Sequence, residues 1–224
     1  GIRDCLLSRG LGDVYKRQTL VSAGKIFMEK SHEKKVRILP VDSEHSAIFQ
    51  CLEKNNIDNV DFITLTASGG PFLNMPIENF KNIKPKDAIK HPVWKMGKKI
   101  SVDSATMFNK ALEIIEASVL FNINSDKIEV TVHPEHIIHG LVHYKDGSIL
   151  ANLGFPDMIT PLSVALNWPS RLDLNLQKLS LAKINNLRFY EPDLKKFPSL
   201  KLGWDALQNP LCSPVVLNAS NEIA

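Results

Sequence analysis

At 224 residues, with 44% hydrophobic and 23% charged residues, the chain has the size and composition of a globular protein built on one large domain. Its net charge is only +3, and its basic residues are scattered without an aromatic-basic pattern, which argues against a nucleic-acid partner. Three widely spaced cysteines argue against a disulfide framework or a zinc knuckle, and the sequence holds no apolar run of about 18 residues that could span a membrane.

Residues 1–18 differ from the rest of the chain, because they have no sustained hydrophobic period and mix Gly, Arg, Asp and Cys. From Thr19 the pattern becomes helical, and a charged stretch from Glu29 to Lys35 ends this predicted helix. We therefore expect residues 1–18 to be a segment separate from the rest of the chain.

An acidic motif, Asp42-Ser43-Glu44-His45, follows a short strand predicted over residues 36–41. Asp42 and Glu44 are two positions apart, so an extended backbone would point both to one side. Such a pair of carboxylates suits Mg²⁺ or Mn²⁺. Alternatively, Asp42 or Ser43 caps a helix that runs through Leu52, with acidic groups near its positive end. The two roles are compatible, and the motif alone leaves both open.

A second strand is predicted over residues 60–66, and it ends in Ser68-Gly69-Gly70-Pro71. Glycines after a strand let backbone N–H groups approach an anion, although this sequence is more often an ordinary turn. Residues 83–99 form a polar connection punctuated by proline. Within it, Trp94 and Met96 either anchor the loop on the core or belong to a lid that closes over a ligand.

The next segment is predicted as a short strand over residues 100–103 and a helix from Ser104 to about Phe121. Asn109 and Glu113 are four residues apart and therefore share a face of this helix. Lys110 and Glu113 are either a pair on a solvated face or part of a site, and the helix pattern alone does not decide between them.

The remaining elements are strands at residues 128–133 and 148–153, the latter closing a hairpin at Asp146-Gly147. A helix is predicted at 159–167, a strand near 187–190 and a final helix at 202–207, and the chain ends inside a helical pattern that suggests truncation. Four histidines, at positions 133, 136, 139 and 143, are interpreted as structural or surface residues, because an alternating strand points some of them to opposite faces.

Taken together, three carboxylates could hold one divalent cation, while hydroxyls, an amide, a lysine and a histidine could bind a phosphate. In these same segments the chain strongly resembles the 1-deoxy-D-xylulose 5-phosphate reductoisomerase family. The matching strings are Leu39-Pro40-Val41-Asp42-Ser43-Glu44-His45, Ser68-Gly69-Gly70-Pro71-Phe72, His91-Pro92-Val93-Trp94-Lys95-Met96-Gly97, the whole of residues 100–113, His133-Pro134-Glu135, Asp146-Gly147-Ser148 and Trp168-Pro169-Ser170-Arg171.

The resemblance implies site roles and a reaction. Asp42, Glu44 and Glu113 would bind Mg²⁺ or Mn²⁺, with Co²⁺ a further option, and Glu44, Glu113 and His91 would be catalytic. The implied substrate-binding residues are Ser43, Glu44, Ser68, His91, Ser104, Asn109, Lys110 and Glu113. Gly97 and Met96 would contact NADPH. The implied reaction rearranges a ketose phosphate and reduces it with NADPH to 2-C-methyl-D-erythritol 4-phosphate, in non-mevalonate isoprenoid biosynthesis.

The implied fold is α+β, with a mixed sheet flanked by helices in a catalytic domain at residues 19–190. Residues 191–224 would be a linker and the start of a truncated C-terminal helical domain, and the family's N-terminal Rossmann domain is missing. Where the family has Asn-Lys-Glu, this chain has Lys16-Arg17-Gln18. In the family that Lys-Glu pair would contact substrate and cofactor, and Arg17 could imitate the lysine's charge, although the exchange is not conservative. This departure implies that residues 1–18 are a non-native or non-family segment.

The resemblance also implies a homodimer for the full-length protein, with a small phosphosugar as its partner and neither nucleic acid nor membrane. The expected location is the cytoplasm of a bacterium, or a plastid in a eukaryote.

Two alternative functions stay open. Without a nucleotide domain the chain could be a non-catalytic fragment that binds metal and phosphosugar, or it could be a metal-dependent sugar-phosphate isomerase that needs no NADPH.

Overall fold

The computed structural model describes residues 12–90 and 97–223. Its strands are β1 (Val60–Ala67), β2 (Ile128–Val132), β3 (Ile138–Tyr144) and β4 (Ile149–Leu153). Its α-helices are α2 (Gly12–Glu33), α3 (Ser43–Cys51), α4 (Pro85–Ala88), α5 (Lys98–Ala105), α6 (Phe108–Phe121), α7 (Ile159–Asn167), α8 (Ser199–Leu207) and α9 (Ser213–Ile223). Short 3₁₀ helices are η1 (Lys54–Asn59), η2 (Ile77–Asn82), η3 (Ser125–Lys127) and η4 (Leu181–Lys183).

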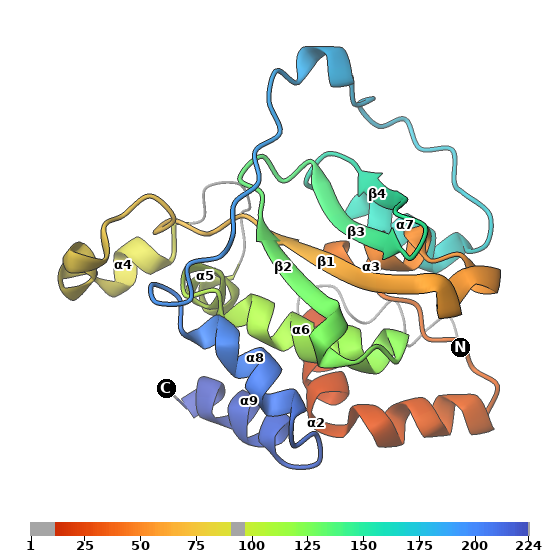
Figure 1. Ribbon diagram of the computed structural model, residues 1–224, viewed down its shortest axis with the longest axis horizontal. Helices are drawn as coiled ribbons and strands as arrows, with labels where there is room; N and C mark the ends of the chain where they lie inside the picture. The colour runs from red at the N-terminus through yellow and green to blue at the C-terminus, as the bar shows by residue number, and fades with distance from the viewer. Residues whose placement is uncertain (1–11, 91–96, 224) are drawn as a thin grey trace.

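The four strands form one mixed sheet in the order β2-β1-β3-β4 (Figure 1). β1 pairs with β2 in parallel and with β3 antiparallel, and β3 and β4 form the predicted hairpin around Asp146-Gly147. β1 is rich in β-branched and aromatic residues, which favour a pleated strand packed on both sides. The mixed sheet with flanking helices confirms the expected α+β class.

One continuous core joins the sheet to the helices that carry the acidic motif and the Asn109–Glu113 segment. Ile63 and Leu65 of β1 are fully buried and belong to the same apolar cluster as Ile48 of α3 and Ile114 of α6. Because β1 is central, it fixes α3 and α6 relative to one another.

A group of four helices, α2, α6, α8 and α9, lies on one side of the sheet (Figure 1). A smaller apolar cluster of Val21, Leu112, Ile115 and Ala206 joins α2, α6 and α8. α2 therefore belongs to the folded body, and it begins at Gly12 rather than at Thr19, so the boundary predicted at residue 18 falls inside a helix.

Two predicted strands are wrong. Residues 36–41 pair with no other strand of the described chain, although their sequence favours extended structure. Residues 100–103 lie in α5, where Ser101 Oγ donates to Gly97 O at 3.0 Å and Lys99 Nζ lies 2.7 Å from Asp103 Oδ2. These contacts within one helical turn outweigh the alternating Ile-Ser-Val-Asp pattern.

The helix predicted from Ser104 to Phe121 is interrupted. Met107 is buried and adopts a left-handed backbone conformation with φ of 59°, which ends α5 and lets α6 start at Phe108 in a new direction. The strand predicted near residues 187–190 is reduced to a single antiparallel bridge between Tyr190 and Val132.

In the part of the chain that the structure describes, we find no helix with the length and apolar character needed to cross a membrane.

Candidate metal and substrate site

Three carboxyl groups named from the sequence meet in the structure. One oxygen each from Asp42, Glu44 and Glu113 lies within 4.8 Å of the others, and all three residues are buried. Asp42 precedes α3, Glu44 lies in its first turn, and Glu113 comes from the middle of α6. Such a concentration of buried negative charge is costly unless cations balance it.

Asp42 both caps α3 and faces the carboxylate cluster. Its Oδ1 accepts the backbone N–H of Glu44 at 3.2 Å, and its backbone oxygen accepts the N–H of Ser46 at 2.8 Å. Ser43 Oγ donates to Glu44 Oε2 at 2.7 Å. The capping and metal-binding interpretations of this motif are therefore compatible in three dimensions.

The face of α6 that carries Asn109 and Glu113 is buried rather than solvated. Lys110 and Glu113 are among the most buried polar residues of the chain, and Lys110 Nζ pairs with Glu113 Oε2 and lies 3.3 Å from Glu44 Oε1. Asn109 donates its side-chain amide to Glu113 Oε1. The solvated-face alternative for the Lys110–Glu113 pair is therefore wrong.

Two residues outside the predicted set extend this cluster. Glu116 lies one turn beyond Glu113 on α6 and is buried. His45 is fully buried, with Nδ1 3.3 Å from Asp42 Oδ1 and 3.8 Å from Glu116 Oε2, while its Nε2 lies 3.0 Å from the backbone oxygen of Glu113. The i, i+3 spacings of Asp42 to His45 and of Glu113 to Glu116 are the sequence signal that could have found them.

Arg17 of α2, which stands where the family has a lysine, also reaches the cluster. Its guanidinium donates to Asn109 and to Asp42 Oδ2, and it lies 3.7 Å from Glu113 Oε1 and 3.4 Å from Glu116 Oε2. Because it sits in the segment assigned to residues 1–18, no sequence argument connected it to the carboxylates.

The pKa values of the cluster follow from this packing. Burial favours neutral Asp42, but Arg17 and His45 outweigh it and hold the pKa of Asp42 well below its ordinary value. Burial raises the pKa of Glu113, which Lys110 opposes and the like charges of Asp42 and Glu44 reinforce.

The cationic partners shift in the opposite sense. Burial disfavours a charged His45, yet Glu116 and Asp42 raise the pKa of His45 to about 10. Burial likewise disfavours charged Lys110, but Glu113 and Glu44 raise its pKa above the ordinary value. The neighbouring carboxylates therefore favour the charged form of both side chains, and Asp42, His45 and Glu116 also lie at metal-ligand spacing.

The turn after β1 brings two predicted substrate-binding residues, Ser68 and Ser104, close to one another. Gly69 and Gly70 both have positive φ, and the Gly70 N–H bonds to Ser68 Oγ at 3.2 Å. A Cβ on Gly70 would meet Ser104 O at 2.8 Å and Ala105 Cα at 3.0 Å. Gly70 is therefore required both for its backbone conformation and for the close approach that sets the Ser68 turn against Ser104.

The predicted cofactor contacts are only partly described. Gly97 is exposed at the start of α5, where an added Cβ would meet open space. His91, Trp94 and Met96 lie outside the described residues, so the substrate, cofactor and lid roles predicted for them stay predictions.

The histidines of the β2–β3 region are built into the fold. His133 is fully buried, with Nδ1 2.8 Å from Arg188 O, and its Nε2 accepts the N–H of Ile137 at 3.1 Å. His143 stacks on Phe62 with ring centroids 3.9 Å apart. Among the described residues, none of the four histidines belongs to a group with metal-ligand spacing.

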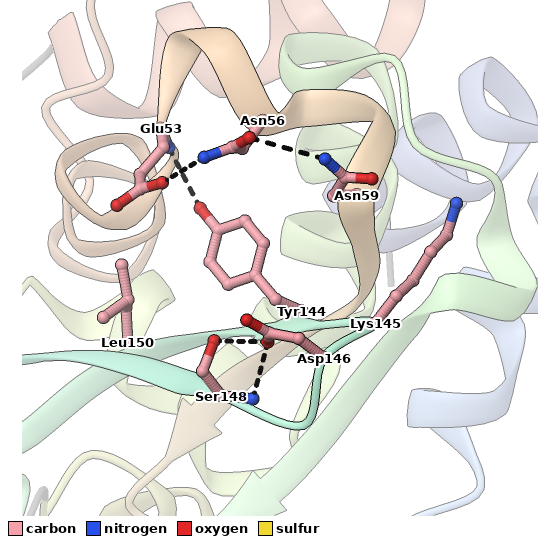
Figure 2. A pocket seen from close by; sticks show the side chains of 8 residues that line it. All are labelled: Glu53, Asn56, Asn59, Tyr144, Lys145, Asp146, Ser148 and Leu150. Atoms are coloured by element: carbon pink, nitrogen blue, oxygen red, sulfur yellow. Dashed lines mark hydrogen bonds between the residues drawn. The ribbon is translucent and has the colours of Figure 1, made fainter.

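A separate cavity of about 490 Å³ lies between η1 and the β3–β4 hairpin (Figure 2). Tyr144 is central to it, and its hydroxyl donates to Cys51 O and accepts the N–H of Glu53, each at 3.0 Å. None of the predicted site residues lines this cavity, and the tyrosine is engaged structurally.

The donor chemistry of the cluster fits a hard divalent cation. Asp42, Glu44 and Glu113 offer carboxylate oxygens only, and hydroxyl and amide groups lie beside them. Mg²⁺ and Mn²⁺ prefer such oxygen ligands and keep positions for water or substrate when two or three carboxylates hold them. The three carboxylates therefore suit a Mg²⁺ or Mn²⁺ ion.

The sequence was also compared with protein families and with known proteins. Residues 38–121 match the family model described as the 1-deoxy-D-xylulose 5-phosphate reductoisomerase C-terminal domain, and residues 153–224 match that of the DXP reductoisomerase C-terminal domain. Relatives named 1-deoxy-D-xylulose 5-phosphate reductoisomerase include one from Prosthecochloris aestuarii, 53% identical over 208 residues, and one from a Wolbachia strain of Drosophila simulans, 56% identical over 210 residues. Each match covers 93% of this chain and 54% of the relative.

Solved structures give the same result. One DOX-P reductoisomerase, crystallised with NADPH, fosmidomycin and magnesium, matches with a TM-score of 0.88 and 42% identity over 92% of this chain and 53% of its own. The enzyme from Zymomonas mobilis in complex with NADPH matches with a TM-score of 0.86 and 44% identity over 92% and 53% of the respective chains. The chain thus spans about half the length of the curated relatives it matches.

Proposed function

Because the chain belongs to the 1-deoxy-D-xylulose 5-phosphate reductoisomerase family, we propose that it provides the metal- and substrate-binding half of such an enzyme. The reaction would be the rearrangement of 1-deoxy-D-xylulose 5-phosphate and its NADPH-dependent reduction to 2-C-methyl-D-erythritol 4-phosphate. The observation that carries the proposal is the convergence of Asp42, Glu44 and Glu113, from two helices, in a buried cluster.

In this proposal the carboxylates of Asp42, Glu44 and Glu113 hold Mg²⁺ or Mn²⁺. The cation would supply Lewis acidity, which polarises the ketose carbonyl and stabilises negative charge that develops on its oxygen. Ser43, bonded to Glu44, would orient the hydroxyl-bearing end of the substrate.

The phosphate end of the substrate would be bound by Ser68, Ser104, Asn109 and Lys110. The Ser68 turn lies against Ser104, and Asn109 and Lys110 open α6. Hydroxyl, amide and ammonium donors of this kind bind phosphate oxygens, and Lys110 adds a buried positive charge. His91 would join them, and Gly97 and Met96 would border NADPH.

Loss of Glu113 is the direct test of the metal site. We expect Glu113→Gln to weaken Mn²⁺ binding, measured by calorimetry, by about 100-fold or more, because removal of a residue that merely orients a metal ligand already costs about 10- to 100-fold. Glu129→Gln makes the same change at an exposed position of β2 and should leave the affinity unchanged. Equal Mn²⁺ affinities for wild type and Glu113→Gln would contradict the three-carboxylate assignment.

A second candidate function is binding of metal and phosphosugar without turnover. It requires only the buried carboxylate cluster of Asp42, Glu44 and Glu113 and its neighbours, all of which lie within the described residues. The two candidates separate in one assay, NADPH oxidation on addition of substrate and Mg²⁺, run beside calorimetric binding of fosmidomycin. Binding with turnover supports the enzyme, whereas binding without turnover supports the non-catalytic function.

A further inference from the structure

The helix α5 carries Ser104, a proposed phosphate ligand, but it has little apolar packing of its own. All eight residues of α5 are described, and Ala105 is the one buried apolar residue among them, while Val102 is exposed. Met107, in its left-handed conformation, separates α5 from α6, so α5 does not continue in the direction of α6. The position of Ser104 therefore depends on polar contacts between α5 and other elements.

The end of α5 is held at two points. Ser199 Oγ of α8 donates to the backbone oxygen of Thr106, and the absence of a side chain on Gly70 lets the Ser68 turn approach Ser104 O. A helix held only at one end can still tilt about that end. Contacts nearer the start of α5 are therefore needed to fix its orientation.

The helix α9 supplies those contacts. Asp103 is buried, and its Oδ1 accepts the side-chain amide of Asn221 at 3.2 Å, whereas its Oδ2 lies 2.7 Å from Lys99 Nζ. Lys99 Nζ also lies 3.1 Å from Glu222 Oε1, so the ammonium stands between two carboxylates. We call these four side chains, two from α5 and two from α9, the α5–α9 network.

This network joins α5 to a helix that is itself anchored. Leu217 of α9 packs against the apolar cluster that joins α2, α6 and α8. A buried carboxylate that loses a hydrogen-bond donor bears a desolvation cost, so the Asn221 amide resists any movement that would part it from Asp103. Because Asp103 directly precedes Ser104 in the helix, a rotation of α5 that broke this bond would also turn Ser104.

We propose that the α5–α9 network positions the phosphate site: it holds α5 in the orientation that sets Ser104 against the Ser68 turn. Asn221 and Glu222 are then positioning residues, which act on the substrate only through α5. This inference rests on the proposed function, because it presupposes that Ser68 and Ser104 bind the phosphate. Displacement of a binding group by about 1 Å can cost on the order of 100-fold in activity, so small movements of α5 matter.

The test is calorimetric binding of fosmidomycin with Mg²⁺, whose phosphonate stands in for the phosphate, beside binding of Mn²⁺ alone. Asn221→Asp replaces the amide donor with a carboxylate facing Asp103. We expect it to weaken fosmidomycin binding by about 10- to 100-fold. Mn²⁺ affinity should not change, because the three carboxylates of the metal site lie outside α5. Asn185→Asp makes the same exchange at an exposed position after η4 and should match wild type.

A second variant separates positioning from a general loss of stability. Asp103→Asn combined with Asn221→Asp restores the hydrogen bond with donor and acceptor reversed, so it should recover most of the lost fosmidomycin affinity. Equal fosmidomycin affinities for wild type and Asn221→Asp would overturn the inference. A parallel loss of Mn²⁺ binding, or a double variant that recovers nothing, would overturn it as well.

Glu222→Lys keeps the inference testable if Asn221→Asp does not fold, because Glu222 is exposed. It places a second cation beside Lys99 and should weaken fosmidomycin binding by about two- to fivefold, the value of a surface ion pair. Glu78→Lys makes the same change of charge at an exposed position of η2 and should not weaken binding. Unchanged or tighter binding by Glu222→Lys would contradict the positioning role. Absence of fosmidomycin binding by wild type would instead overturn the proposed phosphate site, and the inference with it.

Discussion

Cys51 and Cys212 differ sharply in their surroundings. Cys51 is buried at the end of α3, and burial raises the pKa of its thiol to about 11, whereas Cys212 is exposed between α8 and α9. The thiolate is the reactive form of cysteine, so at pH 8 only about one Cys51 in a thousand is ionised.

We therefore expect a maleimide to modify Cys212 rapidly in the native protein and Cys51 at least about 100-fold more slowly, because Cys51 is both un-ionised and inaccessible. Labelling of Cys51 should rise with pH between 7 and 9, below its pKa. Peptide mapping by mass spectrometry would locate the label, and urea should make both sites reactive. Equal native labelling of the two cysteines would contradict the burial of Cys51.

Some of the site residues can be predicted from local sequence motifs, and others cannot. Asp42, Glu44 and Glu113 could be predicted because they lie in local motifs with a regular spacing. Their convergence depends on how α3 and α6 pack on β1, which no local pattern contains. Arg17 reaches the cluster only through the crossing of α2 and α6, so its contacts with the carboxylates could not be predicted from residues 12–18 alone.

At the scale of elements, β1, β2, β4, α3 and α7 follow their sequence patterns closely. The failures have a common physical cause. Residues 36–41 and 100–103 both have strand-like sequences, but a strand also needs a partner strand, and neither segment pairs with any strand of the sheet β2-β1-β3-β4. Pairing is a property of the whole sheet rather than of the segment.

The crossing of α6 and α8 depends on a glycine. A Cβ on Gly203 would lie 2.6 Å from Ala111 O and 2.9 Å from Ala111 Cα, and these backbone atoms cannot move aside independently. Gly203→Ala should therefore force the two helices apart and destabilise the protein.

We expect Gly203→Ala to cost about 1–3 kcal/mol, the range typical of overpacked cores. In a chain of this length that corresponds to a fall in Tm of roughly 3–10 °C, measured by calorimetry or circular dichroism. Gly154→Ala is the control, since its Cβ would lie an ordinary 3.9 Å from His139 Nε2. Equal melting temperatures for the two variants would show that the helices adjust without strain.

At the scale of the whole molecule, one region of the surface is unusually apolar. Ile159, Leu162 and Leu166 lie on one stripe of α7 and are between about a third and a half exposed. β4, which packs against α3 as α7 does, is an edge strand with exposed Ile149. Stripes and unpaired edges of this kind commonly mark sites of association. This region is where we expect the homodimer predicted from the sequence to form.

Ile159→Lys combined with Leu166→Lys should weaken dimerisation by about 100-fold or more, because burial of each such side chain contributes about 1.5–3 kcal/mol. Sedimentation velocity over a range of concentrations would measure the change. Leu211→Lys removes an exposed apolar side chain from the turn between α8 and α9 and should leave dimerisation unaltered. A purely monomeric wild type, or a dimer indifferent to the double substitution, would refute the interface.

The two carboxylate oxygens of Asp42 have different partners, and this difference has a spectroscopic consequence. Oδ1 accepts a hydrogen bond from the amide N–H of Glu44 while Oδ2 pairs with the Arg17 guanidinium, and the two oxygens share one delocalised charge. Whatever withdraws electron density through Oδ2 weakens the acceptor at Oδ1. The ¹⁵N and ¹H chemical shifts of this single backbone amide would therefore report which cation sits in the cluster, without a label, a chromophore or a substrate.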